Sequence, residues 1–328
     1  MQNILKKSSI SQETLPHVEV LLATFNSENY LEDFLKSLST QQGVTIHLLV
    51  SDDGSTDKTL KILEEFRSQF FTLKILEGPH LGPAANFFNL LEQSNMQFVA
   101  LADHDDVWQT CHLADSIQRI QKMPYDSLPL LSISKVSEFN EIAGTFSIWP
   151  NEKLEIKFPG ILYENVGRGC TMVLNKALVD LINASKKEYA IMHDWWILLL
   201  AWLYGEIVFT QESEVNYRIH PGNVVGNPNL TLVSIIKRAI ISKMGRPRHL
   251  QIASLHAQYS AKYSYLERYS HLDVWLKKIH SPWFVKLPIF FEKQRLRSNK
   301  FQDFLLKISI VLLRCKPTGT KCKLVKYD

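Results

Sequence analysis

Three carboxylates lie within four positions in the segment ALADHDDVWQ, residues 100–109, directly after an apolar run. Carboxylates this close repel one another unless a positive group lies between them. Mg²⁺ commonly binds one or two carboxylates together with substrate phosphates. Asp103 and Asp105 therefore form a candidate site for Mg²⁺ or Mn²⁺ carrying a phosphorylated substrate. The alternative from spacing alone is a solvated loop in which Asp106 caps the next helix.

A second acidic pair, Asp52 and Asp53, occurs in SDDGSTD, residues 51–57. A capped turn at Gly54 explains most of this composition. A carboxylate at a strand end can also accept a hydrogen bond from the ring N–H of uracil or thymine. The segment is therefore consistent with either a structural turn or a base-binding site.

The segment MHDWW places Asp194 beside His193 and just before Trp195 and Trp196. A carboxylate near indole rings can have a raised pKa, which suits a general base. Equally, the tryptophans can belong to the core, with Asp194 as a helix cap.

In YRIHPGN, residues 217–223, Arg218 and His220 are two positions apart and so lie on the same face of a strand. Two cations there could meet a pyrophosphate. The alternative, which the residues alone favour, is a strand exit with one buried, hydrogen-bonded histidine.

The elements that must position these groups alternate over about the first 124 residues. Apolar runs predict buried strands, and residues with helical spacing follow each of them, the first helix with Ser27 as a candidate cap. Such alternation predicts an α/β fold with a parallel sheet, whose ligands bind beyond the carboxyl ends of the strands. The expected strands are 18–24, 45–51, 72–76 and 97–103, and the helices are 27–41, 55–70, 82–94 and one ending near Met123.

The alternation weakens after residue 124. Strands are expected within 128–136, 168–174 and 215–220, and a helix over 192–205 that stops at Gly205. Helical patterns with interspersed Lys and Arg dominate from about residue 229. The Gly, Pro and Asn of HPGNVVGNPN indicate a boundary near 228. We therefore expect an N-terminal extension (1–16), a main domain (17–228) and a basic, mainly helical C-terminal region (229–328).

Charge is divided unevenly along the chain. Residues 1–230 contain 17 Lys and Arg against 28 Asp and Glu, a net charge of −11, whereas residues 231–328 contain 20 against 5, a net charge of +15. The four cysteines show neither metal-type spacing nor a disulfide framework. No segment has the length of a signal peptide core or a membrane span. These features predict a cytoplasmic protein.

Taken together, the motifs resemble those of inverting family 2 glycosyltransferases with a GT-A fold. The similarity is greater to bacterial rhamnosyltransferase-like members that build surface polysaccharides. It covers roughly residues 17–227 and is carried, in the family's order, by LLATFNSENYLEDFLKSLSTQ, VSDDGSTDKT, LADHDDVW, GRGCTMVLN, HDWW and YRIHPGNVVG.

The resemblance implies a role for each motif position. Thr24 and Asn26 would lie by the base and ribose of the donor, Asp52 would pair with the base, and Asp53 would support that loop. Asp103 and Asp105 would be the acids of the Asp-x-Asp motif, with Asp103 also counted among the donor-binding residues and Asp105 the more direct ligand of Mg²⁺ or Mn²⁺. Asp194 would be the catalytic base, and Arg218 and His220 would stabilise the leaving pyrophosphate. The acceptor or sugar pocket would contain Arg168, Gly169, His193 and Trp195.

Two departures from the family pattern affect the donor pocket. The segment QTCHL follows the acidic motif where relatives often have a Pro and a basic residue, and His104 occupies the middle of Asp-x-Asp. Neither change removes a metal ligand, but both leave the shape of the pocket open.

The expected reaction moves a sugar from dTDP-rhamnose or a UDP-sugar to a glycan or a polyprenyl-linked acceptor. A sugar nucleotidyltransferase and a non-catalytic assembly partner are the alternatives. No nucleic-acid motif accompanies the basic region, so an anionic membrane surface is the expected partner of that region. The location would then be peripheral, on the inner face of the cell membrane. The alternative is that the region packs on the catalytic domain.

Overall fold

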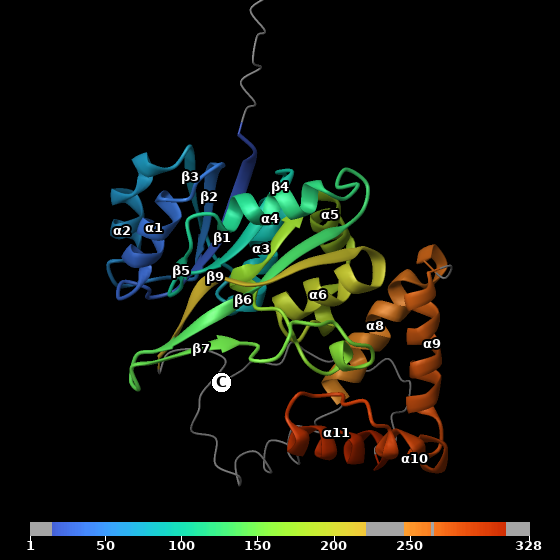
Figure 1. Cartoon of the computed structure of the whole chain (residues 1–328). Coiled ribbons are helices and arrows are strands. Elements are labelled where there is room, and N and C mark those ends of the chain that lie inside the picture. Colours follow the sequence, from blue (N-terminus) through green and yellow to red (C-terminus); the bar gives the residue numbers. More distant parts are fainter. Residues whose placement is uncertain (1–14, 221–245, 264–265, 313–328) are drawn as a thin grey trace, which may run out of the picture.

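The computed structural model describes residues 15–220, 246–263 and 266–312 (Figure 1). Its first half contains four parallel strands in the spatial order β3-β2-β1-β4, connected by helices. The strands are β1 (His17–Thr24), β2 (Thr45–Asp52), β3 (Thr72–Glu77) and β4 (Phe98–Asp103), and the helices are α1 (Leu31–Ser39), α2 (Thr59–Glu65) and α3 (Pro83–Gln93). The alternation expected from the sequence is confirmed here.

The second half of the sheet mixes strand directions. β8 (Val173–Asn175) runs antiparallel to β4, and β6 (Leu130–Asn140) runs antiparallel to β8. β9 (Glu206–Ile219) runs parallel to β6 and antiparallel to the short edge strand β5 (Val107–Trp108). β7 (Thr145–Trp149) pairs with the end of β6. The sheet is mixed and mostly parallel, which confirms the expected α/β class.

Further helices cover this second half. They are α4 (His112–Gln121), α5 (Lys176–Ala184) and α6 (His193–Tyr204), with single 3-10 turns at η1 (Arg67–Gln69), η2 (Gly160–Leu162), η3 (Gly169–Thr171) and η4 (Lys187–Tyr189). α6 ends at the expected glycine, because a Cβ on Gly205 would lie 2.0 Å from the carbonyl oxygen of Pro129. Only glycine allows the chain to pass that close to β6.

Two hydrophobic cores lie on the two faces of the sheet. Successive side chains of a strand point to opposite faces, so Leu21 joins the core of α3, α5 and α6, while Val20 and Leu22 join the core of α1 and α4. α6 is buried from Trp195 to Tyr204. A helix that is apolar all round must be buried, which explains the uninterrupted apolar run WWILLLAWLY.

The C-terminal region is helical, as expected. It contains α8 (Arg246–Tyr263), α9 (Glu267–His280), α10 (Trp283–Phe291) and α11 (Lys300–Leu312). Its buried residues belong to the same core as α6. Several hydrogen bonds attach it to the rest of the chain, among them Tyr204 Oη donating to Leu255 O at 3.1 Å and Trp275 Nε1 donating to Tyr163 Oη at 2.9 Å.

Some expectations lie outside the described residues or differ locally. The boundary near 228 and most of the extension 1–16 lie outside them. Ser27 does not cap α1 through its side chain; its Oγ accepts instead from Phe25 N at 3.2 Å, and α1 begins only at Leu31. Among the described helices, none combines the length and apolar character needed to cross a bilayer.

Candidate active site

The carboxyl ends of β1 and β2 are joined by side chains. Thr24 lies opposite Asp52 in the register, and its Oγ1 donates to Asp52 Oδ1 at 2.7 Å. Asp52 also accepts from Ser55 Oγ at 2.6 Å and from the N–H groups of Gly54 and Ser55 at 3.2 and 2.8 Å. The carboxylate therefore holds the loop after β2 in place. Its contact with a nucleobase stays a prediction.

Asp53 and Asn26 tie neighbouring loops together. Asp53 accepts from the N–H groups of His80 at 2.8 Å and Gly82 at 3.2 Å, which connects β2 to the loop after β3. Asn26, at a positive φ of 49°, accepts from Thr56 N at 2.9 Å. Gly78 permits this arrangement, because a Cβ there would lie 2.4 Å from Asp53 Oδ1. Asp53 thus connects the loops after β2 and β3, and its support of a donor-binding loop stays a prediction.

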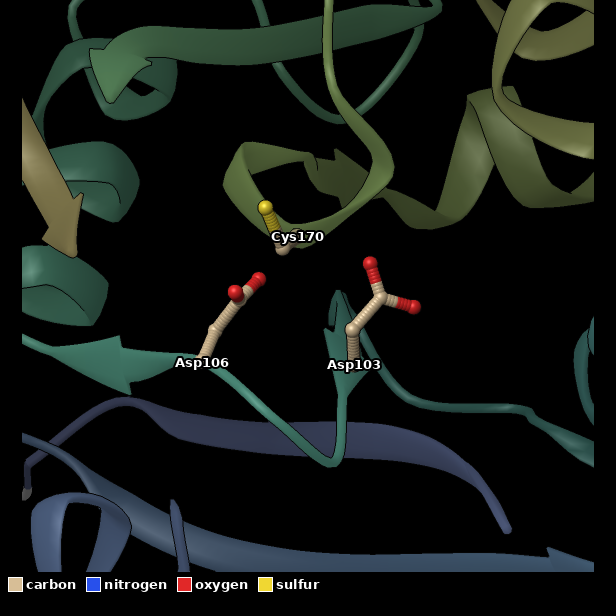
Figure 2. A group of neighbouring side chains, drawn as sticks. All are labelled: Asp103, Asp106 and Cys170. Atoms are coloured by element: carbon tan, nitrogen blue, oxygen red, sulfur yellow. The ribbon is translucent and has the colours of Figure 1, made fainter. Parts of the chain in front are cut away.

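The acidic segment lies one strand further along the same edge. Asp103 ends β4 and lies beside Ala23 of β1 in the register. One ligand-type atom each of Asp103, Asp106 and Cys170 lies within 4.8 Å of the others. Figure 2 shows Asp103 at the end of β4 and Asp106 just before β5, with both carboxylates pointing to the side where Cys170 of η3 lies. Asp106 is fully buried, so it does not cap a helix in a solvated loop.

The electrostatics of this cluster suit a divalent cation. Burial, together with the charges of Asp105 and Asp194, raises the pKa of Asp103 to about 7. Burial and the neighbouring acids also raise the pKa of Asp106, whose buried Oδ2 has no hydrogen-bond partner among the described residues. A hard cation would relieve this repulsion and supply the missing partner. The donor set therefore fits Mg²⁺ or Mn²⁺.

Cys170 is a poor ligand for such an ion. Burial and the nearby acids Asp106 and Asp103 raise the pKa of its thiol well above the usual value, so the thiol stays protonated at neutral pH. Only the thiolate binds metals well, and it prefers softer ions. Cys170 acts here as a neutral neighbour of the two carboxylates.

Asp105 faces His220 rather than Asp103. Its buried carboxylate Oδ2 lies 2.9 Å from His220 Nε2, and the imidazole packs against the ring of Tyr30 with centroids 4.4 Å apart. Arg218 binds Glu141 through Nη1 at 2.8 Å and Asp33 through Nη2 at 3.1 Å. Its backbone N–H donates to Asp106 Oδ1 at 3.2 Å. The end of β9 thus lies against the acidic turn, as a site for a leaving group requires.

These contacts give different surroundings to Arg218 and His220, the two residues predicted to stabilise the leaving group. Arg218 is already committed to two ion pairs and to Asp105 O, at 3.0 Å from Nε, so it holds the turn together. His220 lies directly on one of the predicted metal ligands. Both roles toward a pyrophosphate stay predictions.

Asp194 approaches the cluster from α6. It lies in the first turn of that helix, and its Oδ1 accepts from Trp195 N at 2.7 Å. Burial raises its pKa to about 6, although hydrogen bonds from Trp195 N and the Asn165 side chain and the charge of Arg168 pull the pKa down. A Cβ on Gly169 would lie 3.6 Å from Asp194 Cβ. The same Cβ would lie 3.2 Å from His193 Nε2, so η3 packs closely against the start of α6 at Gly169.

Arg168 is held in a cage of aromatic and acidic groups. Its guanidinium carbon lies 4.4 Å from the ring centroid of Trp149 and 4.0 Å from that of Tyr217, and its Nη2 pairs with Glu138. Its charge lowers the pKa of both Asp103 and Asp194. Arg168 and Gly169 thus lie near Asp103 and Asp194. Their contact with a sugar stays a prediction.

His193 and Trp195 are buried. The His193 ring stacks on Phe87 with centroids 4.1 Å apart, and burial lowers its pKa to about 3, so it is neutral. Trp195 packs in the core and donates from Nε1 to Ile161 O at 2.9 Å. The Trp195 indole thus anchors α6 onto η2, and the place of His193 and Trp195 in an acceptor or sugar pocket stays a prediction.

Sequence reasoning missed Asp106, Cys170 and Glu138 as neighbours of the site. Asp106 was visible in the motif, but only the structure shows that it is fully buried. Cys170 lay within a quoted motif, yet its proximity depends on the antiparallel pairing of β8 with β4. No sequence signal indicates that Glu138 pairs with Arg168.

Parallel strands with acidic side chains at their carboxyl edge are typical of nucleotide-binding α/β proteins. Residues 19–178 match the model of glycosyl transferase family 2, and this segment of the chain belongs to that family. A dTDP-rhamnosyl transferase, RfbG of Shigella flexneri, is 26% identical over 230 residues, which are 66% of this chain and 77% of RfbG.

Two further similarities involve one Staphylococcus aureus protein. Its poly(ribitol-phosphate) beta-N-acetylglucosaminyltransferase TarS (strain Mu50 / ATCC 700699) is 34% identical over 113 residues, 33% of this chain and 20% of TarS. The crystal structure of S. aureus TarS 1-349 in complex with UDP-GlcNAc has a TM-score of 0.55 at 18% identity and covers 90% of each chain. The GT-A fold expected from the motifs is thereby confirmed.

Proposed function

We propose that this chain is an inverting glycosyltransferase that moves a sugar from a nucleoside diphosphate to an acceptor hydroxyl. One arrangement carries the proposal: α6 brings Asp194 against Gly169 of η3, and the next residue of η3, Cys170, lies within 4.8 Å of the carboxylate of Asp103 at the end of β4. A base beside a candidate cation and nucleotide site is the arrangement that a single displacement at the anomeric carbon requires.

Each residue of the candidate site has its own role in this reaction. Asp194 takes the proton of the acceptor hydroxyl as that oxygen attacks, and the nucleoside diphosphate leaves from the opposite face. Asp103 and Asp105, which lie close enough for the charge of Asp105 to raise the pKa of Asp103, would hold Mg²⁺ or Mn²⁺, with Asp106 as a further buried carboxylate beside Asp103. When bound, the ion would neutralise charge on the diphosphate. Arg168 keeps the pKa of Asp194 below what burial alone would give, so more of the base is ionised at neutral pH.

The donor is dTDP-rhamnose in this proposal, supported by the similarity to RfbG over most of its length. A UDP-hexose is the second candidate, supported by the fold shared with TarS in its UDP-GlcNAc complex. The acceptor is a growing surface glycan or a polyprenyl-linked glycan. A nucleotidyltransferase would release pyrophosphate, and a non-catalytic partner would release nothing.

A donor panel with Asp194→Asn tests the proposal. Incubation with dTDP-rhamnose and UDP-hexoses in the presence of Mn²⁺ should release a nucleoside diphosphate from one donor. Asp194→Asn should lower kcat by about 10²- to 10⁴-fold, because general base catalysis is lost. Donor affinity by calorimetry should change little.

Asp180→Asn is the matched control, since Asp180 is exposed on α5. That variant should behave as the wild type. Most of the activity surviving in Asp194→Asn would rule out the base, and released pyrophosphate would favour the nucleotidyltransferase.

A further inference from the structure

Helix α10 exposes large apolar side chains along one face. Trp283 and Phe291 are 61% and 73% exposed, and Phe284 and Leu287 are exposed as well. Their positions, at i, i+1, i+4 and i+8, fall on one side of a helix. Lys286 and Ile289 lie on the opposite side and are buried. α10 therefore anchors to the protein by one face and presents aromatic groups with the other.

Helix α11 continues this apolar surface. Phe301 and Phe304 are exposed, whereas Leu306 and Ile310 on the other side of α11 are buried. The Phe304 ring contacts Phe290 of α10 with centroids 5.5 Å apart. The two helices form the lower border of the molecule in Figure 1, on the far side from β3 and α2. We call the exposed residues 283, 284, 287, 291, 301 and 304 the aromatic face.

Positive charge surrounds the aromatic face. Lys293 and Arg295, between the two helices, and Lys300, the first residue of α11, are exposed. The two acids of residues 281–312 are both paired, Glu292 with Lys278 at 2.5 Å and Asp303 with Lys307 at 3.2 Å. In the sequence, residues 313–328 add five Lys and Arg against one Asp. An occupant of this surface should therefore be apolar and anionic.

We propose that the aromatic face docks on an anionic lipid bilayer, with Trp283, Phe284 and Phe291 entering the interfacial region. Trp and Phe on a helix face partition into the boundary between headgroups and acyl chains, and Lys and Arg nearby are attracted to anionic headgroups. A second copy of this chain fits less well, because a symmetric contact would place the same cations opposite one another.

The docking proposal refines the membrane association expected of the basic region and depends on no catalytic step. Vesicle binding measures it without donor or acceptor, so its failure would leave the proposed transferase activity untouched. The full chain is floated with phosphatidylcholine vesicles and with vesicles that also contain phosphatidylglycerol. The wild type should float with the anionic vesicles only and should dissociate partly at high salt.

The double variant Phe284→Asp/Phe291→Asp should lower the partition coefficient onto anionic vesicles by about tenfold or more, since two large apolar side chains no longer leave water. Phe71→Asp is the matched control, because Phe71 is 68% exposed and directly precedes β3, which lies far from α10 and α11 in Figure 1. Equal unfolding midpoints of the variants would show that both remain folded. The control should bind as the wild type does.

Three outcomes would overturn the proposal. They are equal binding of the double variant and the wild type, binding that does not depend on phosphatidylglycerol, and absence of binding. A wild-type dimer by light scattering that the double variant converts to a monomer, without vesicle binding, would assign the aromatic face to a second copy of the chain.

Discussion

Asp194 shows how the surroundings of a single residue set its chemistry. The carboxylate is placed on the first turn of an otherwise apolar helix, where burial raises its pKa to about 6 and Arg168 limits the rise. A base with that pKa is mostly ionised at neutral pH and still holds a transferred proton better than a solvent-exposed Asp does.

The pH dependence of kcat/KM should report this pKa. Because the base must be ionised, activity should fall as the pH drops below about 6 and reach a plateau above about 7. A pH series with saturating Mn²⁺ measures the acid limb. Arg168→Gln should move that limb to higher pH by removing a positive charge, and Arg168→Lys should restore it in part. If Arg168→Gln does not shift the acid limb, the charge of Arg168 does not lower the pKa of the base, contrary to this prediction.

The proposed metal binding is also argued at single residues. Asp105→Asn should weaken Mn²⁺ binding in the presence of a nucleoside diphosphate by about tenfold or more, because one of the hard oxygen ligands loses its charge. Calorimetric titration measures this directly. Asp126→Asn, at an exposed loop position, is the control and should bind Mn²⁺ as the wild type does. Unchanged affinity in Asp105→Asn would exclude Asp105 as a ligand.

Among the elements, the regular ones were predictable and the long-range pairings were not. β1, β2 and β4 are mostly buried on both faces, so their apolar runs stand out from the intervening amphipathic helices, whereas the edge strand β3 has only Leu73 buried. β9 was expected only over 215–220, because the polar stretch TQESE, residues 210–214, hides a strand that in fact begins at Glu206. Much of the site arises from such pairings: β9 places Arg218 and His220, and β8 places Cys170.

Glu214 fixes β9 to helix α4. It is buried and accepts from Arg119 Nη1 and Nη2 at 2.6 and 2.8 Å, and it lies 3.1 Å from His112 Nδ1. Burial alone would raise the pKa of Glu214, but hydrogen bonds from His112 and Arg119 hold it below the usual value. This cluster lies next to the pairing of Val215 with Trp108, which keeps β9 against the acidic turn.

Glu214→Ala should lower the free energy of unfolding by about 3 kcal/mol, because it leaves Arg119 without its buried partner. Denaturant unfolding at neutral pH measures the change. Since the pKa of Glu214 is depressed in the folded protein, the wild-type advantage should shrink as the pH falls below the usual range of a glutamate. Glu212→Ala, two residues away and exposed, should cost little. An equal effect of the two variants would contradict the structural role.

At the scale of the whole molecule, the C-terminal helices share a core with the catalytic half. The sequence predicted a separate basic region from the Gly, Pro and Asn near 228, and its helices were predictable from their periodicity. The packing of these helices against α6 was not predictable. Because α6 has no polar face, its sequence does not indicate which of its sides contacts the sheet and which contacts the C-terminal helices. The core that contains α6 also contains Leu255, Trp275 and Leu306.

Trp275 tests whether this shared core makes the chain a single cooperative unit. Its indole is buried and donates to Tyr163 Oη next to η2, so Trp275→Ala should cost about 3 to 5 kcal/mol. The whole unfolding transition should shift, and nucleotide binding should be lost at the same denaturant concentration as helical circular dichroism. Trp283→Ala, at an exposed position on α10, should leave the transition in place. Two separate transitions, of which Trp275→Ala moves only one, would instead make residues 229–328 a domain that unfolds independently of the active site.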